Sequence, residues 1–401
     1  MKILARLLTY GVSEVLNRLA PIITSFILAK KLGAESFGEL SLIVVGVEIL
    51  FIFISNNIQA VSRIEFFKRN TEEYIEFSKN AFCFSFFVFF FSLLLIGILS
   101  LIEADASLLL LPCIALFRSM AQFYLSTLQC SKESWSYFKV QITFILVFFV
   151  SFSLTLNYGI YSWILSMLIA VISQAIIGMV LVRKKTGICI FPLAFHRKLN
   201  WSQVKFGYSF MPQALGWWMK SGLDRYIISF SYGLSILGKY SLSYQFASSI
   251  MILVSALNLT IVPEINSLIK QKKNLANDKV NKIYFASFTL IVVSSLAIYF
   301  LSTIIIEYYF QDYDKAISYL PFPLISLMIQ ASSLIMMNEL YFRDHGWFVA
   351  RLVFLNFLLQ GVLSFLLSKS FGIEAVLINS ILFNLVLFTF VLVKVNNSRA
   401  I

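Results

Sequence analysis

Charged side chains are scarce in this sequence. Asp, Glu, Lys and Arg make up 13% of the residues, whereas an ordinary soluble domain has about 25%. Apolar residues make up 59%, and 41 residues are phenylalanine. A soluble protein of 401 residues has too small an interior to bury so many apolar side chains. The composition therefore excludes a soluble globular protein and predicts an integral membrane protein.

Residues typical of catalytic and metal centres are also few. The two histidines, His196 and His345, lie far apart in predicted loops and have no ligand-spaced neighbours. No metal-binding or redox spacing links the cysteines, which are Cys83, Cys113, Cys130 and Cys189. The phosphate-binding pattern GxxxxGK followed by Ser or Thr is absent. We therefore predict a transporter rather than an enzyme, with no metal or bound cofactor, driven by an H⁺ or Na⁺ gradient or by substrate flux.

Twelve apolar stretches are long enough to span a bilayer, which takes about 20 residues. They cover residues 7–29, 38–62, 80–102, 107–129, 138–157, 159–182, 206–229, 237–263, 283–305, 316–340, 347–368 and 372–394. The loops between these spans leave no room for a soluble domain. We therefore predict an all-α integral membrane protein with twelve transmembrane helices.

Lysine and arginine are unevenly distributed over the predicted loops. When both termini and the even-numbered connections share one side, most basic residues fall on that side, and the other side has only Lys30, Lys31, Lys239, Lys315 and Lys369. The positive-inside rule then places both termini in the cytoplasm. This placement accounts for the net charge of +12 without nucleic acid as a partner.

The chain divides into two similar halves. A basic connector, residues 183–205, separates six spans in residues 1–182 from six in residues 206–401. The pattern Gly-x-x-x-x-Gly-x-x-Ser-Leu begins at Gly33 and again at Gly233. Because both halves begin in the cytoplasm, the repeat is parallel. We predict two six-helix bundles related by a pseudo-two-fold axis along the membrane normal.

Seven of the charged residues within the spans are candidates for a site, because a cation there costs about 2.5–3.5 kcal/mol and usually faces a protein-lined or hydrated interior. They are Glu14, Arg18, Glu48, Arg118, Lys220, Asp224 and Arg225. Further charges, at Glu264, Glu339 and Arg343, lie at cytoplasmic span ends, where we expect water to reach them.

The charges within the spans have two interpretations. Glu14 with Arg18, and Lys220 with Asp224, have the four-residue spacing of pairs that can simply hold helices together. Arg225 can extend to the outer interface. A different interpretation makes Arg18, Arg118, Lys220 and Arg225 anion-binding groups in a central cavity, with Glu14, Glu48 and Asp224 as coupling or charge-balancing groups. Arg118 favours it, because its own helix offers no acidic residue within a turn.

Several short motifs carry a resemblance to a known family. These are LGAESFGELS after the first span, Pro212 and Leu223-Asp224-Arg225 in the seventh, and LGKYSL after it. With twelve spans in two halves, they resemble the polysaccharide flippases (Wzx-type, O-antigen transporters). That family shares a superfamily with the multidrug/toxin extruders and the lipid II flippases. Lipid II flippases typically have fourteen spans, which disfavours that branch.

The resemblance implies a V-shaped pair of six-helix lobes in the bacterial inner membrane. It also implies that an undecaprenyl-diphosphate-linked oligosaccharide moves from the cytoplasmic to the periplasmic leaflet by alternating access, for O-antigen or capsule synthesis. The expected partners are this lipid-linked oligosaccharide, membrane lipid, a polysaccharide polymerase and a chain-length regulator. Cations at mid-depth fit such a cargo, because guanidinium groups bind phosphate in a bidentate manner.

Two other functions stay open. An ion-coupled antiporter that exports drugs or small metabolites can have the same architecture, but an exporter of organic cations is expected to place acidic groups in its cavity. A membrane enzyme such as a glycan polymerase or ligase usually needs a large outer loop, and the sequence predicts none.

Overall fold

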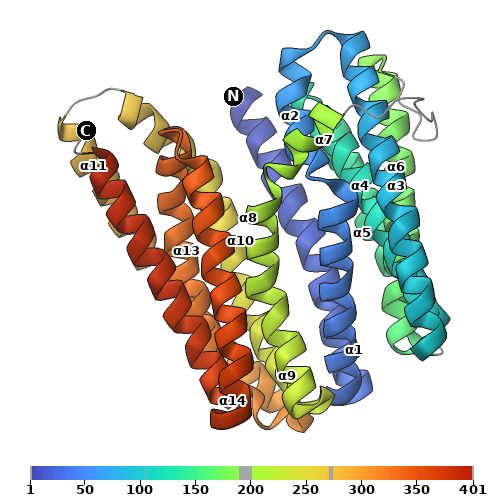
Figure 1. The fold of residues 1–401 in the computed structure, drawn as a ribbon, viewed down its shortest axis with the longest axis vertical. Coiled ribbons are helices and arrows are strands. Elements are labelled where there is room, and N and C mark those ends of the chain that lie inside the picture. Colours follow the sequence, from blue (N-terminus) through green and yellow to red (C-terminus); the bar gives the residue numbers. More distant parts are fainter. Residues whose placement is uncertain (1, 104, 189–200, 271–273, 400–401) are drawn as a thin grey trace. The chain divides into compact units, whose positions relative to one another are not determined.

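The computed structural model describes residues 2–103, 105–188, 201–270 and 274–399, which are helical and contain no strand. Figure 1 shows the course of the chain. Contacts group the residues into two compact units. Unit 1 contains Met1–Leu28 and Ile43–Ala214, and unit 2 contains Ala29–Leu42 and Leu215–Ile401. Residues 29–42, which join the first two spans, therefore pack with the rest of unit 2, although both spans lie in the first half of the sequence.

The predicted lobe limits depend on the connector 183–205. Residues 189–200 of this connector lie outside the described residues. The lobe limits of 1–182 and 206–401 therefore stay a prediction.

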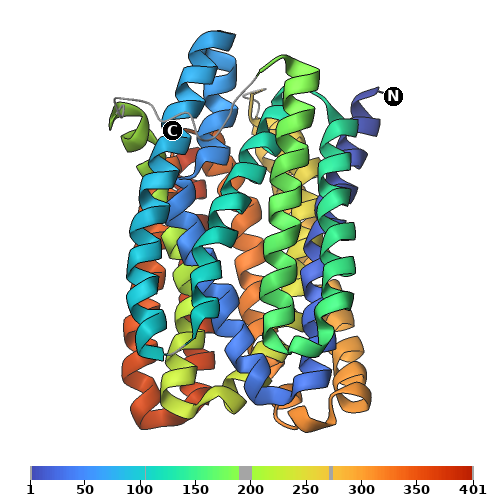
Figure 2. The same cartoon turned by 90° about the vertical axis from the view of Figure 1, so that its right-hand side faces the viewer.

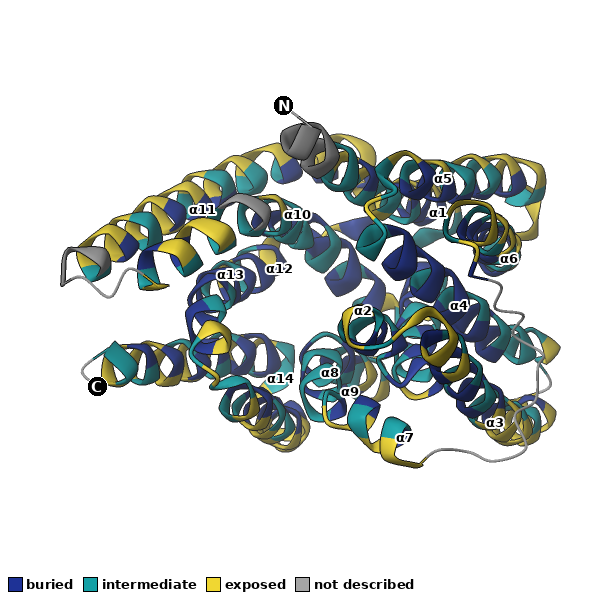
Figure 3. Ribbon diagram, turned by 90° about the horizontal axis from the view of Figure 1, so that it is seen from above, coloured by how far each residue is buried: buried dark blue, intermediate teal, exposed yellow. Residues whose placement is uncertain are grey.

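Unit 1 is built around the nearly buried helix α4 (Leu110–Cys130). In the view of Figure 3, α4 is mostly coloured as buried, whereas α3 carries many exposed residues. The side chains of Phe82, Phe123 and Tyr124 are fully or almost fully buried in its core. The other helices are α1 (Lys2–Ser55), α2 (Ile58–Lys68), α3 (Thr71–Glu103), α5 (Ser134–Thr155), α6 (Ile160–Thr186) and α7 (Trp201–Tyr208). In the view of Figure 2, the helices α3, α4 and α6 are turned toward the viewer and run nearly parallel.

Besides residues 29–42, unit 2 contains the chain from Leu215 onward, which starts within α8 (Met211–Trp218). A π-helical turn, Met219–Leu223, joins α8 to α9 (Asp224–Tyr232). The remaining helices are α10 (Leu234–Lys270), α11 (Asn274–Tyr309), α12 (Ala316–Tyr319), α13 (Pro321–Phe342) and α14 (Gly346–Arg399).

The predicted spans can be traced through these helices. Within the described residues, nine helices are long and apolar enough to cross a membrane. Two of them contain a pair of spans each, because α1 reverses at Gly33 (φ 79°) and α14 at Gly372 (φ 78°), where a positive φ suits glycine. The seventh predicted span consists of α8, the π turn and α9, which are too short to count singly. All twelve predicted spans are thereby accounted for.

Exposed apolar side chains cover the outer surfaces of the long helices. Along α3, Phe87, Phe90, Phe91 and Leu94 are all exposed. A contiguous apolar surface of this kind is costly in water and suits the acyl chains of a bilayer. The protein is therefore a multi-pass membrane protein.

Candidate functional site

The seventh span changes its helical geometry where its charged residues lie. The α-helical bonding of α8 gives way to a π turn at Met219–Leu223, and α-helix resumes at Asp224. Single π turns within helices occur often at functional sites. Gly222 is a weak helix former that lowers the cost of the irregularity here. The π turn carries Lys220, whose side chain is only 2% exposed.

Two cations of this span share one aromatic ring. The Nζ of Lys220 lies 5.4 Å from the ring centroid of Tyr244 in α10, and the Cζ of Arg225 lies 5.0 Å from the same centroid. A ring face attracts cations through its quadrupole, by about 2 kcal/mol or more when the contact is desolvated. One ring does not neutralise two charges, so the contact orients the cations and leaves their charge available.

The carboxylate of Asp224, next to Arg225, is hydrogen-bonded by a side chain of another helix. Asp224 is 2% exposed, and its two oxygens accept hydrogen bonds from Nε2 of Gln360 in α14 at 3.1 and 3.3 Å. Asn379 in turn donates to the backbone oxygen of Gln360 at 3.1 Å and to Oγ of Ser364 at 2.8 Å. These bonds fix Asp224 toward α14.

The two cations retain unused hydrogen-bond donors. Within the described part of the chain, neither Lys220 nor Arg225 forms an ion pair with a carboxylate, and the buried Nε of Arg225 has no acceptor. The remaining polar contact of Arg225 is long, from NH1 to the backbone oxygen of Ser41 at 3.5 Å. Buried charge is costly unless it is paired and hydrogen-bonded. We call Lys220, Asp224, Arg225 and Tyr244 the cation cluster. It has a net positive charge and free donors suited to an anion.

Arg118 has an anionic partner in unit 1. Its NH1 lies 2.6 Å from Oε1 of Glu48, and its Cζ lies 4.6 Å from the ring centroid of Phe51. The two charged side chains are 26% and 42% exposed, so part of this pair can reach a ligand or water. The partner that the sequence requires for Arg118 thus comes from another helix. Whether Arg118 also contacts cargo stays a prediction.

Glu14 is held by α5. It accepts hydrogen bonds from the hydroxyl of Tyr137 and, at 3.1 Å, from Nε2 of Gln141. The Oε1 of Gln141 accepts from Nδ2 of Asn17 at 2.7 Å and from Nε2 of Gln174 in α6 at 2.9 Å. This chain of amide and carboxylate groups connects α1, α5 and α6.

Arg18 is exposed on α1, on a different face of the helix from its exposed apolar residues. Val12, Leu16, Ile23 and Ile27 form an exposed apolar stripe on this helix. With about 100° per residue, Arg18 points roughly 150° away from the centre of that stripe. Arg18 is itself exposed, so it does not share the surface that suits acyl chains.

The structure thus gathers the predicted residues into separate groups. Lys220, Asp224 and Arg225 lie together in unit 2. In unit 1, Glu48 pairs with Arg118, while Glu14 belongs to the α5 network.

Comparison with known proteins identifies the family. Residues 3–269 match the family model described as "Polysaccharide biosynthesis protein". The chain belongs to this polysaccharide biosynthesis family. The chain is similar in sequence to the "Lsg locus putative protein 1" of Haemophilus influenzae. The two are 24% identical over 360 residues, and the alignment covers 85% of each protein.

Solved structures show which fold this family member has. An inward-facing multidrug resistance MATE family transporter of the MOP superfamily superposes with a TM-score of 0.72 at 12% identity, covering 96% of this chain and 95% of that one. An outward-facing MATE transporter gives a TM-score of 0.65 at 11% identity, covering 98% and 96%. At such low identity the likeness establishes the fold alone, which is the two-lobed fold of MATE transporters.

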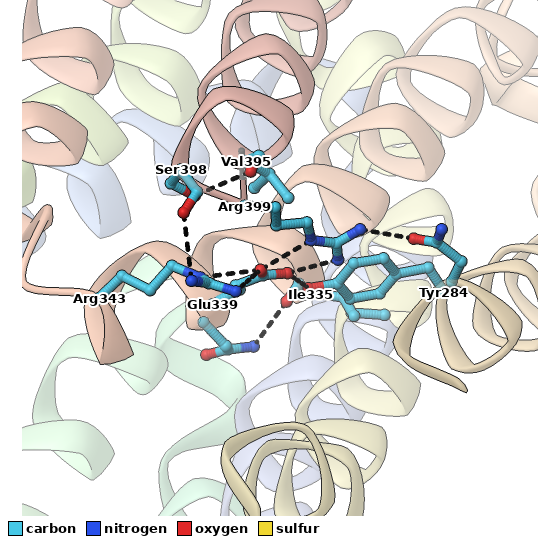
Figure 4. Close-up of polar contacts among 9 residues, drawn as sticks. Tyr284, Ile335, Glu339, Arg343, Val395, Ser398 and Arg399 are labelled. Carbon is cyan, nitrogen blue, oxygen red and sulfur yellow. Dashed lines mark hydrogen bonds and ion pairs between the residues drawn. The ribbon is translucent and has the colours of Figure 1, made fainter. Parts of the chain in front are cut away.

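One charged group of this polysaccharide biosynthesis protein is placed differently from expectation. Glu339 is 0% exposed rather than hydrated, because α11, α13 and α14 enclose it (Figure 4). Arg343 binds its Oε1 at 2.9 Å, Arg399 binds its Oε2 at 2.6 Å, and the hydroxyl of Tyr284 donates at 2.9 Å. Arg343 and Arg399 also bond Ser398 and Asn281. Since every group here is satisfied within the protein, this cluster holds three helices together and leaves little for a ligand.

The sequence analysis missed four residues of the Glu14 network and the cation cluster with its partners: Tyr137, Gln141, Tyr244 and Gln360. The two glutamines lie inside predicted spans, where an amide needs a partner, and this signal could have found them. The two tyrosines are indistinguishable in sequence from the many aromatic residues that only pack.

Proposed function

We propose that the protein is a flippase that moves undecaprenyl-diphosphate-linked oligosaccharide repeat units across the inner membrane by alternating access. The observation that carries this proposal is the cation cluster, in which Lys220 and Arg225 are held on Tyr244 with donors unused. Membership of a polysaccharide biosynthesis family and a transporter fold support it.

The chemistry of the cargo explains why such a cluster is needed. A diphosphate and a glycan cannot cross hydrocarbon unaided, whereas the polyprenyl tail never has to leave it. The ammonium of Lys220 offers a compact charge, and the guanidinium of Arg225 offers paired donors with the geometry of a phosphate. Asp224, fixed by Gln360, keeps the net charge of the cluster at one and so allows the anion to leave again.

Carboxylates supply the coupling in this proposal. Glu14 in its network with Tyr137 and Gln141, Glu48 beside Arg118, and Asp224 in the cation cluster are the groups that would exchange H⁺ or Na⁺ during the cycle. Delivery of the flipped unit to a polysaccharide polymerase and a chain-length regulator completes the proposed pathway.

The test compares variants of the cation cluster with a matched surface cation. Lys369 in α14 is exposed and lies 4.9 Å from the ring centroid of Phe365, so Lys369→Ala removes a similar contact outside the cluster. In proteoliposomes with a fluorescent polyprenyl-diphosphate oligosaccharide, Lys220→Ala and Arg225→Ala should each lower flipping at least 10-fold, because a charged hydrogen bond contributes about 1.5–3 kcal/mol. Lys369→Ala should flip like the wild type.

The sign of the cluster separates the flippase from a drug antiporter of the same fold. Two cations and one carboxylate favour an anion and repel a cationic drug. Wild-type protein that leaves the lipid-linked oligosaccharide in place, but exchanges an organic cation for protons, would overturn the proposed function.

A further inference from the structure

The repeated Gly-x-x-x-x-Gly-x-x-Ser-Leu pattern packs against itself. Its first copy begins at Gly33 within α1, and its second copy begins at Gly233, just before α10. Gly33 (φ 79°, ψ 178°) and Gly233 (φ 85°, ψ 171°) have nearly the same backbone conformation, which a residue with a side chain rarely adopts. Both copies belong to unit 2, at its end opposite to the C-terminal end of α14 (Figure 1).

The second glycine of each copy touches the backbone of the other copy. A Cβ added to Gly38 would overlap the carbonyl oxygen of Leu234, and a Cβ added to Gly238 would overlap that of Ala34. Ala34 and Leu234 hold the same position in the two copies. The contact is therefore reciprocal, as in a two-fold symmetric dimer interface.

A serine pair lies next to the glycines. Ser241 donates to Oγ of Ser41 at 2.8 Å, both side chains are buried, and the two residues are 200 positions apart, the offset of the repeat. Equivalent residues that bond each other lie on the two-fold axis of an interface. We call the contact between residues 34–41 and residues 234–241 the glycine seam.

The loop after α11 holds both sides of the glycine seam. Tyr313 donates to the backbone oxygen of Ala29 at 2.9 Å and packs edge-on against Phe37. Asp314 pairs with Lys239 at 2.5 Å, and this hydrogen bond holds the pKa of the Asp314 carboxyl below its usual value. These contacts explain why residues 29–42 group with unit 2, although the same helical spans continue into unit 1 on either side.

We infer that the glycine seam is a gate: residues 34–41 separate from residues 234–241 during the transport cycle, and Arg225 links the gate to the cation cluster. The two copies can part without repacking side chains, since their backbones meet through small residues and weak contacts rather than interlocked side chains. Among the described residues, the polar bonds at the seam are those between Ser41 and Ser241, from Arg225 to Ser41 and in the adjoining loop, where Asp314 is 64% exposed.

The link through Arg225 is a single hydrogen bond. Its guanidinium reaches the backbone oxygen of Ser41, inside the seam, at 3.5 Å. A phosphate is a stronger acceptor for guanidinium than a peptide oxygen. An anion bound in the cation cluster therefore competes for Arg225 and removes one contact that keeps residues 34–41 in place. This second part rests on the proposed function.

A cysteine pair tests the gate. In a background in which the four native cysteines are serine, Ser41→Cys and Ser241→Cys place two thiols where the hydroxyls lie 2.8 Å apart. Oxidation should give a disulfide-linked peptide in mass spectrometry and reduce flipping at least 10-fold, and reduction should restore it. The control pair is Ser231→Cys with Ser368→Cys, whose hydroxyls lie 3.1 Å apart between α9 and α14, away from the seam. It should cross-link and keep flipping.

The outcomes separate the gate from the proposed function. Failure of Ser41→Cys and Ser241→Cys to cross-link, or full flipping in the cross-linked protein, overturns the gate while leaving the flippase intact. If wild-type protein flips no lipid-linked oligosaccharide, opening of the gate is measured instead as the rate at which a membrane-impermeant maleimide labels the single variant Ser41→Cys. Adding Gly238→Ala should then raise the labelling rate severalfold, and an unchanged rate overturns the gate.

Discussion

Arg118 in α4 donates to Glu48 in α1 at 2.6 Å, so two charges 70 residues apart in sequence form one pair within the spans. Both side chains remain partly exposed, and such pairs contribute about 1 kcal/mol or less to stability. A structural role and a role in contacting cargo predict different outcomes when the charges are exchanged.

The exchange variant combines Glu48→Arg with Arg118→Glu. We expect each single change to lower both the melting temperature and flipping, because it places two like charges side by side. The exchange should recover the melting temperature but less than a tenth of the flipping rate, because the cation then lies on α1 instead of α4. Thermal unfolding in detergent and the proteoliposome assay provide the two measurements. Full recovery of flipping would show that Arg118 acts only as a structural partner.

The sequence predicted the spans and the depth of the charges because both depend on local composition. The stretch 80–102 carries no charge and is recognised by itself, and Lys220 is a charged residue inside a predicted span whatever surrounds it. The partners could not be predicted in the same way. Gln360 meets Asp224 across 136 residues, which depends on how α9 and α14 are rotated about their axes. The burial of Glu339 likewise depends on Arg399, 60 residues away.

Glu14 gives a prediction about energy coupling. Its carboxylate accepts hydrogen bonds from Tyr137 and Gln141, and Glu14 is not one of the cations proposed to bind the cargo. We expect Glu14→Gln to bind the lipid-linked oligosaccharide with unchanged affinity while its flipping no longer responds to an imposed proton or sodium gradient. Glu103→Gln, an exposed carboxylate at the end of α3, is the matched control and should respond like the wild type. A gradient-responsive Glu14→Gln protein would exclude Glu14 from coupling.

The glycine seam predicts a pair of equal effects. Gly38→Ala and Gly238→Ala each place a methyl group on a carbonyl of the other copy, and we expect each to destabilise the crossing by about 1–3 kcal/mol, as overpacking does. Because the contact is reciprocal, the two variants should lower the melting temperature by similar amounts. Gly97→Ala is the control, since its methyl group would meet only Leu109, at 3.8 Å. Strongly unequal effects of the two seam variants would contradict the reciprocal contact.

Glu339 gives a prediction about stability that is independent of transport. Its carboxylate binds Arg343, Arg399 and Tyr284 while fully buried, so Glu339→Gln leaves two guanidinium groups short of their counter-charge. Removal of one partner from a buried ion pair typically costs about 3–5 kcal/mol, and a loss of this size should appear as a much lower melting temperature in detergent. Glu307→Gln, an exposed carboxylate near the other end of α11, should melt like the wild type. A Glu339→Gln protein that is as stable as the wild type but inactive in flipping would instead assign this cluster to the transport cycle.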